Sequence, residues 1–267
     1  MPCSQTRSDS HLRTEQPSRP ELRERRAYEP NLPQERFIVP VLKSEIERCI
    51  ARFGKPVRFG AKAVDIGCGG QPFRPVLEES GYSYCAVDVN PDGGPPVDIV
   101  CAADDAIPEA LMRRGPFDLL LCTEVLEHVA HWERALSNFS LLLSPGGRAI
   151  ITAPFVYQLH EEPYDFWRPT IHAFDVFARE LGFTTLYRRQ AGDVWSVIGT
   201  VLATCHFSSR TRRLRDRIVL RIIKVATHWA HHGLLSGVIQ SAVTAEAPYY
   251  LSNVIVFEKP VHDLARV

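Results

Sequence analysis

Short apolar runs alternate with amphipathic segments from about residue 61 to the end of the chain. The runs are short, rich in β-branched residues or leucine, and bounded by Gly, Pro or Asp, as buried strands are. Strands are therefore predicted at residues 61–66, 83–89, 97–101, 117–122, 147–154, 183–189 and 252–257. The spacing of apolar positions between and before these runs predicts helices at residues 37–53, 74–80, 109–114, 131–143 and 174–181.

This alternation of strands and helices implies that most strands pair in parallel. We expect an α/β fold with a Rossmann-like, doubly wound sheet of about seven strands, mostly parallel with an antiparallel last strand. A helical insertion at about 195–243 precedes that last strand. Residues 1–30 are rich in Arg, Glu, Ser and Pro and poor in apolar side chains, so we expect a disordered or loosely attached arm before one domain at 31–267.

A glycine-rich turn, V-D-I-G-C-G-G-Q-P-F at residues 64–73, follows the first predicted strand. Glycines there let the backbone approach a ligand closely, and the start of the next helix offers free N–H groups to an anion. Asp88 ends the next strand, where a carboxylate can accept hydrogen bonds from both hydroxyls of a ribose. A dinucleotide motif would need Gly or Ala where this chain has Pro72, so the pattern favours a single nucleoside with a small carboxylate-bearing tail.

Across about residues 64–257 the chain resembles the class I S-adenosylmethionine-dependent methyltransferases. VDIGCGG matches their first motif, AVDVN supplies the ribose acid, and AADDAIP matches the loop beside the adenine. FDLLLCTEVLEHV and LLLSPGGRAIITAP match the strand-four motif and the turn before strand five. The resemblance implies S-adenosyl-L-methionine as the cofactor. The cofactor-binding residues that it implies are Asp65, Gly67, Cys68, Gly69, Asp88, Val89, Asp104, Asp105, Cys122 and Thr123.

The segment HEEPYDFWRPT, residues 160–170, is similar to a subgroup of this family found in bacterial surface-polysaccharide and natural-product biosynthesis. GCGGQPFRPVL and GDVWSVIG fit the same subgroup. This similarity implies methyl transfer to a small-molecule acceptor, first of all to a hydroxyl of a sugar or secondary metabolite. Two alternatives stay open: C- or N-methylation of a natural product or lipid precursor, and a catalytically silent module that only binds the cofactor.

Methyl transfer to oxygen generally needs a base beside the acceptor. His128 and His160 follow the fourth and fifth predicted strands, at the edge of the sheet where ligands bind. His160 is our first candidate for the base and His128 the second. The residues that we expect to bind the acceptor are Tyr157, Tyr164, Asp165 and Arg168.

Some of these residues also have purely structural interpretations. Asp105 stands before a predicted helix, where Asp is a common N-cap. Glu124, Glu127 and His128 lie near a predicted helix start, where carboxylates interact favourably with the helix dipole. The same residues with His131 suggest metal ligands, but exposed helical His and Glu are usually solvated, so we predict no metal.

The insertion contains a basic amphipathic segment. Its apolar residues recur at helical spacing, with basic residues one position earlier. The apolar stripe is Leu214, Ile218, Ile222, Val225 and Trp229. Three interpretations stay open: a lid whose basic strip faces an anionic acceptor, a peripheral membrane contact, and a helix with a solvated basic edge.

Overall charge, cysteine spacing and apolar stretches argue against several other classes of protein. The 31 basic and 31 acidic residues leave a formal net charge of +0, which argues against a dedicated nucleic-acid binder. Seven scattered cysteines without paired spacing predict reduced thiols in a cytoplasmic protein. The apolar stretches are too short or too often interrupted by charges to span a bilayer, so we expect no integral membrane segment. None of these patterns predicts an oligomeric state.

Overall fold

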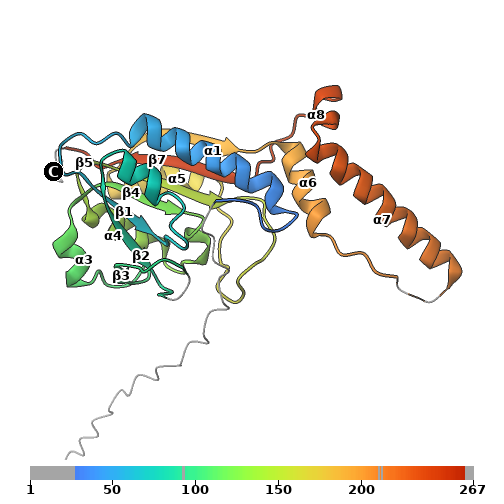
Figure 1. Ribbon diagram of the computed structural model, residues 1–267, viewed down its shortest axis with the longest axis horizontal. Coiled ribbons are helices and arrows are strands. Elements are labelled where there is room, and N and C mark those ends of the chain that lie inside the picture. The colour runs from blue at the N-terminus through green and yellow to red at the C-terminus, as the bar shows by residue number, and fades with distance from the viewer. Residues whose placement is uncertain (1–27, 92–93, 210, 212, 262–267) are drawn as a thin grey trace, which may run out of the picture.

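The buried apolar runs pair into one mixed sheet, shown in the computed structural model of Figure 1. The structure describes residues 28–91, 94–209, 211 and 213–261. Within them, seven strands form a sheet in the order β3-β2-β1-β4-β5-β7-β6. The strands are β1 (Lys62–Ile66), β2 (Ser83–Asp88), β3 (Ile99–Val100), β4 (Phe117–Thr123), β5 (Leu143–Pro154), β6 (Thr184–Ala191) and β7 (Ser252–Glu258). Strands β1 to β5 pair in parallel, whereas β7 is antiparallel to both β5 and β6, so the predicted fold class is confirmed.

Helices cover both faces of the sheet. They are α1 (Glu35–Phe53), α2 (Arg74–Glu79), α3 (Glu109–Arg114), α4 (Trp132–Leu142), α5 (Ile171–Leu181), α6 (Val194–Thr204), α7 (Leu214–Leu235) and α8 (Val238–Ala242), with a 3-10 turn η1 at Leu126–His128. Apolar residues of α1, α2 and α6 pack on one face, and those of α3, α4 and α5 pack on the other. Burial between these layers is the main force that stabilises the domain.

Strand β4 shows why the sequence has continuous apolar runs instead of alternating ones. Successive side chains of a strand point to opposite faces of the sheet. Leu120 and Cys122 pack in the core on the α4 side, whereas Leu119 and Leu121 pack in the core on the α1 side. Because helices cover both faces, every position of this strand segment is apolar.

Several predicted boundaries differ from the structure. Helix α2 begins at Arg74, as predicted, but it ends at Glu79 and not at residue 80. Strand β5 begins at Leu143 instead of residue 147, because Leu143 already pairs with Phe117 of β4. Most of the arm predicted at residues 1–30 lies outside the described residues.

The predicted helical insertion before the last strand consists of α6, α7 and α8. Helix α7 extends away from the sheet, as Figure 1 shows. Its apolar stripe is exposed along most of its length, with 72% of Leu214 and 70% of Trp229 accessible to solvent. In the described part of the chain, no helix has the length and apolar character that crossing a membrane requires.

Candidate functional site

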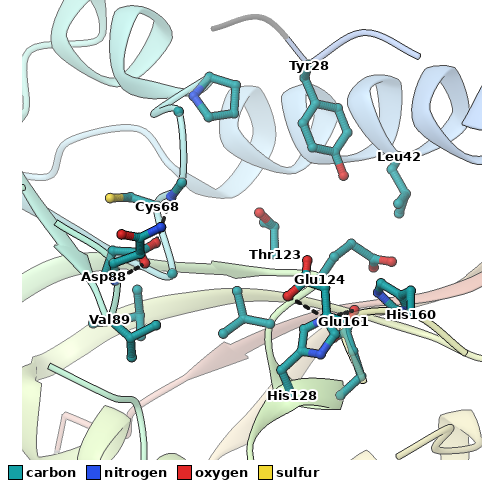
Figure 2. Close-up of a pocket in the computed structure, with 18 of the residues that line it drawn as sticks. Tyr28, Leu42, Cys68, Asp88, Val89, Thr123, Glu124, His128, His160 and Glu161 are labelled. Atoms are coloured by element: carbon teal, nitrogen blue, oxygen red, sulfur yellow. Dashed lines mark hydrogen bonds and ion pairs between the residues drawn. The ribbon is translucent and has the colours of Figure 1, made fainter. Parts of the chain in front are cut away.

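A cavity of about 500 Å³ opens at the carboxyl ends of the parallel strands, where ligands bind in α/β sheets. Its volume lies in the range of small-molecule sites. The loops after β1, β2, β3, β4 and β5 all contribute lining residues, and the segment from Tyr28 to Leu42 covers the cavity from the α1 side. In Figure 2, Cys68 and Asp88 lie at one end of this cavity, and His128, His160 and Glu161 lie at the other.

The glycine turn after β1 forms the floor of the first end. Gly67 adopts a φ of +70°, and a Cβ there would lie 2.3 Å from Cγ2 of Val125, so only glycine fits. Gly69 also has a positive φ, +48°, but a Cβ on Gly69 would meet no atom within 4 Å. The backbone of the turn is therefore open to a ligand on the side of Gly69.

Asp88 both fixes this turn and lines the cavity. Its Oδ2 accepts a hydrogen bond from the backbone N–H of Gly69, and its Oδ1 accepts one from that of Asn90, each at 2.9 Å. Asp88 is buried, with 6% of its surface exposed. Each carboxylate oxygen has further lone pairs, so Asp88 can still accept hydrogen bonds from two hydroxyls of a ligand.

Asp65 is a second buried carboxyl at this end of the cavity. Its Oδ2 accepts a hydrogen bond from the Tyr84 hydroxyl at 2.8 Å. Burial raises the pKa of Asp65 to about 7, and the nearby Asp88 charge adds to the rise, whereas the Tyr84 bond opposes it. A cationic ligand group beside Asp65 would favour its ionised form.

Two histidines and several glutamates meet at the other end of the cavity. The backbone carbonyl of Tyr164 lies 2.8 Å from His128 Nδ1, so Nδ1 donates, and the lone pair of the neutral ring is then on Nε2. His128 Nε2 is 3.8 Å from Glu127 Oε1 and 3.8 Å from Glu161 Oε2. The rings of His128 and His160 meet edge to face, with centroids 4.7 Å apart.

Asp165 and Arg168, from the PYDFWR segment, position His160. The His160 backbone N–H donates to Asp165 Oδ2 at 2.9 Å, and the His160 Nδ1 lies 3.2 Å from the same oxygen. Both oxygens of Asp165 also accept hydrogen bonds from Arg168. Burial lowers the pKa of His160 below its usual value, and His128 lowers it further whenever that ring is protonated, so the His160 imidazole is neutral at neutral pH.

Glu127 is the most deeply buried group of this cluster, with 1% of its surface exposed. Among the described residues, its Oε2 has no hydrogen-bond partner. Burial raises the pKa of Glu127 well above its usual range, and the charge of Glu124 adds to this rise. Glu124 itself accepts a hydrogen bond from the Ser252 hydroxyl at 2.8 Å.

Most of the residues predicted from the sequence line the cavity. They are Asp65, Gly67, Cys68, Gly69, Asp88, Val89, Asp104, Thr123, His128, Tyr157 and His160. Cys122 does not belong to this lining, because its side chain is fully buried in the core below β4. Tyr164, Asp165 and Arg168 lie behind the two histidines, where they position the lining residues.

Asp104 and Asp105 separate in the structure. Asp104 lines the cavity, and its carboxylate accepts a hydrogen bond from the backbone N–H of His131 at 3.2 Å. Asp105 is exposed and is not among the described lining residues. The alternative interpretation of Asp105 as an N-cap is wrong, because α3 begins only at Glu109, after Pro108.

The sequence pattern did not predict that the segment before β1 closes one side of the cavity. The lining includes one side of α1 and three residues that precede this helix: Tyr28, Asn31 and Leu32. All of them come before β1 and the glycine turn in the sequence. The apolar spacing of residues 37–53 predicted the helix, but not that its N-terminal half faces a ligand. Glu127 was weighed as a helix-dipole residue and as a metal ligand that we did not predict, whereas in the structure it is buried and lines the cavity.

The structure gives the lid interpretation of the insertion no support. No described residue between 194 and 243 lines the cavity. The basic strip of α7 therefore does not face an acceptor in this site, and the inference of an anionic acceptor loses its basis. The described lining contains no Lys or Arg, but it contains seven carboxylates: Glu35, Asp65, Asp88, Asp104, Glu124, Glu127 and Glu161.

The fold and the cavity define the class of protein. A parallel sheet with a reversed β7, a glycine turn after β1 and a buried acid at the end of β2 place the cavity at the strand ends where nucleotide ligands bind in α/β sheets. A family model described as a methyltransferase domain matches residues 40–192, more than half of the chain. The chain belongs to this family of methyltransferase domains.

Curated relatives match only in part. A ubiquinone biosynthesis O-methyltransferase from Xylella fastidiosa is 31% identical over 105 residues, which are 35% of this chain and 42% of the relative. One of the same name from a Caulobacter species is 32% identical over 124 residues, 39% of this chain and 47% of the relative. The chain thus spans less than half the length of these relatives.

Solved structures share the fold at low sequence identity. A SAM-dependent methyltransferase from Archaeoglobus fulgidus superposes with a TM-score of 0.50 at 16% identity, covering 82% of this chain and 94% of that one. Coclaurine N-methyltransferase bound to N-methylheliamine and SAH gives a TM-score of 0.50 at 12% identity, covering 81% and 72%. These likenesses concern the fold alone.

Proposed function

We propose that this protein transfers a methyl group from S-adenosylmethionine to a hydroxyl oxygen of a small-molecule acceptor. The observation that carries the proposal is that one cavity has Asp88 and the glycine turn at one end and a histidine cluster at the other. The names of the curated relatives support oxygen as the methylated atom. The similarity of residues 160–170 to the polysaccharide and natural-product subgroup supports a sugar or secondary metabolite as the acceptor.

The residues at the two ends have different roles in this proposal. At the first end, Asp88 accepts hydrogen bonds from the ribose hydroxyls, and the turn at Gly67 and Gly69 lets the backbone approach the cofactor. When bound there, S-adenosylmethionine supplies a methyl group already activated by its sulfonium centre. The chain must then position the acceptor oxygen, exclude water and accept the hydroxyl proton. His128, whose Nε2 lies between two carboxylates, and His160 are the groups placed to do so.

N-methylation of an amine is the second candidate function. The observation that favours it is the acidic lining, with seven carboxylates and no Lys or Arg among the described residues. A protonated amine would be attracted to such a cavity, although it must lose its proton before it can attack the methyl group.

An acceptor panel distinguishes these functions. We expect the purified protein, given S-adenosylmethionine with an isotopically labelled methyl group, to label an alcohol, phenol or sugar hydroxyl. Mass spectrometry and nuclear magnetic resonance would then identify the methylated atom. Label found on nitrogen would replace the proposal by the second candidate. Tight cofactor binding without transfer to any acceptor class would leave only a silent cofactor-binding module.

Cofactor affinity is expected to rise with pH between about 6 and 8. The pKa of Asp65 is about 7, so its carboxyl is mostly protonated below that pH and mostly ionised above it. The cofactor carries a cationic sulfonium and ammonium group, which favour the ionised form. Its dissociation constant should therefore fall as pH rises, by up to about tenfold per pH unit below the pKa.

Calorimetry on the wild type and on Asp65→Asn tests this dependence. The amide of the variant can still accept the Tyr84 hydrogen bond, so the packing is retained. We expect the variant to bind the cofactor more weakly at high pH and to lose most of the slope. An equal slope in both proteins would assign the pH dependence to another group of the site, such as His160.

A further inference from the structure

We propose that Glu127, His128 and His160 bind a divalent cation that contacts the acceptor oxygen. One carboxylate oxygen and two imidazole nitrogens from these residues lie within 4.8 Å of one another. Ligand atoms about 2.1 Å from a shared ion lie roughly 3 to 4 Å apart, so the cluster needs only small side-chain movements to close around one. The role of the cation rests on the proposed function, but its binding does not.

The two imidazoles are already oriented as ligands. His128 Nδ1 donates to the carbonyl of Tyr164, and His160 Nδ1 lies 3.2 Å from the Asp165 carboxylate and 3.3 Å from the Gln158 carbonyl. Arg168 Nη2 also lies near His160 Nδ1, at 3.5 Å, but both acceptors are closer, so we assign the proton of each neutral ring to Nδ1 and the lone pair to Nε2. Metal-binding histidines are typically fixed in this way, by a hydrogen bond from the other ring nitrogen to a carboxylate or carbonyl.

The unpaired oxygen of Glu127 is a separate observation that points to a ligand. A buried carboxylate oxygen without a hydrogen-bond partner is costly, and a bound cation removes that cost. The composition of the cavity lining also favours a cation, because the described lining contains seven carboxyl side chains and no Lys or Arg. Glu127 and Glu161 lie beside the two imidazoles, and Arg168, which is outside the described lining, lies behind His160 with its Nη2 3.5 Å from His160 Nδ1.

The sequence pattern alone predicts no metal, because exposed helical His and Glu are usually solvated. In the structure, the side chains of Glu127 and His128 are only 1% and 9% exposed. The third ligand, His160, comes from the loop after β5, which the spacing around residue 127 does not reveal. One carboxylate with two imidazoles suits Mn²⁺, Fe²⁺, Co²⁺ or Zn²⁺, whereas Ca²⁺ and Mg²⁺ prefer oxygen ligands.

Such an ion would leave coordination positions open for the acceptor hydroxyl and would lower its pKa. The proton passes to the carboxylate of Glu161, whose Oε2 lies 3.8 Å from His128 Nε2. The oxygen then forms its bond to the methyl carbon as the bond from that carbon to sulfur breaks, and the bonding pair stays on sulfur as a neutral thioether. Charge and atoms balance without a further reactant.

Titration with Mn²⁺ tests the binding directly. The full chain, freed of metal by a chelator and desalted, is titrated with manganese chloride while electron paramagnetic resonance measures the free ion. We expect one tight site per chain, and at least about tenfold weaker binding in Glu127→Gln and in His160→Gln. His172→Gln, which changes an exposed histidine on α5, should bind Mn²⁺ like the wild type.

The results can contradict the cation site without contradicting the proposed methyltransferase function. Equal Mn²⁺ affinity in the wild type, Glu127→Gln and His160→Gln would overturn the site, as would the absence of binding below millimolar concentration. Folding of each variant is checked by its thermal midpoint, which Mn²⁺ should raise in the wild type and in His172→Gln only. If the metal-free enzyme methylates its acceptor at the full rate, the catalytic role of the cation is wrong and the proposed function stands.

Discussion

Replacement of Asp88 by alanine is expected to weaken S-adenosylmethionine binding at least tenfold. The variant loses two hydrogen bonds to a charged acceptor, each worth about 1.5–3 kcal/mol, and tenfold corresponds to only about 1.4 kcal/mol. Asp88 also accepts the backbone N–H groups of Gly69 and Asn90, so its loss loosens the turn that approaches the cofactor. Calorimetric titration of the folded variant measures the change in dissociation constant.

Two further variants make this measurement specific. Asp88→Asn keeps one side-chain oxygen as an acceptor, so we expect a loss of affinity between those of the wild type and the alanine variant. Asp105→Ala removes an exposed acid near the site and should leave the affinity unchanged, since Asp105 is not among the described lining residues. Unchanged affinity in folded Asp88→Ala would remove Asp88 from the cofactor site.

Replacement of His160 by alanine is expected to lower turnover by about 10²–10⁴ while cofactor affinity stays nearly intact. His160 lies at the opposite end of the cavity from Asp88, so its loss leaves the nucleoside contacts in place. The same result is expected for His128→Ala, because the two rings are in contact and His128 Nε2 lies between Glu127 and Glu161. Single-turnover kinetics with the identified acceptor, together with cofactor titration, separates the two quantities.

A loss of turnover is expected whether the histidines accept the proton or bind a cation, and the Mn²⁺ titration distinguishes these roles. His172→Ala, on the exposed side of α5, is the matched control and should retain full turnover. If neither His160→Ala nor His128→Ala loses more than a few-fold, positioning alone drives the reaction. A carbon nucleophile or an already ionised acceptor would behave in that way.

The first end of the cavity was predictable because its geometry is local. Strand β1, the turn at Gly67 and Gly69, and Asp88 at the end of β2 follow one another within a single strand–turn–helix–strand unit. Apolar runs identify the strands, parallel pairing brings their carboxyl ends to one edge, and the glycines identify the turn. For that reason the sequence also predicted the class of fold, including the helical insertion before β7.

The sequence alone did not show which side chains at the strand ends point into the cavity. Cys122 and Thr123 are neighbours at the end of β4, yet Thr123 lines the cavity and Cys122 is fully buried in the core. The sequence does not show at which residue a strand leaves the sheet, and a difference of one residue reverses the face. Asp104 and Asp105 differ for a similar reason, since only the fold of their loop turns one of them toward the cavity.

What the sequence by itself determined is the set of elements, the strand–turn chemistry at Asp88 and the class of cofactor. Only the tertiary structure decided that Glu127, His128 and His160 meet, that α1 and Tyr28 cover the cavity, and that α7 lies outside it. Those contacts join segments far apart in the chain, and they depend on how loops and helices pack on the sheet. Periodicity describes the face of one element, but it does not specify which other element that face will meet.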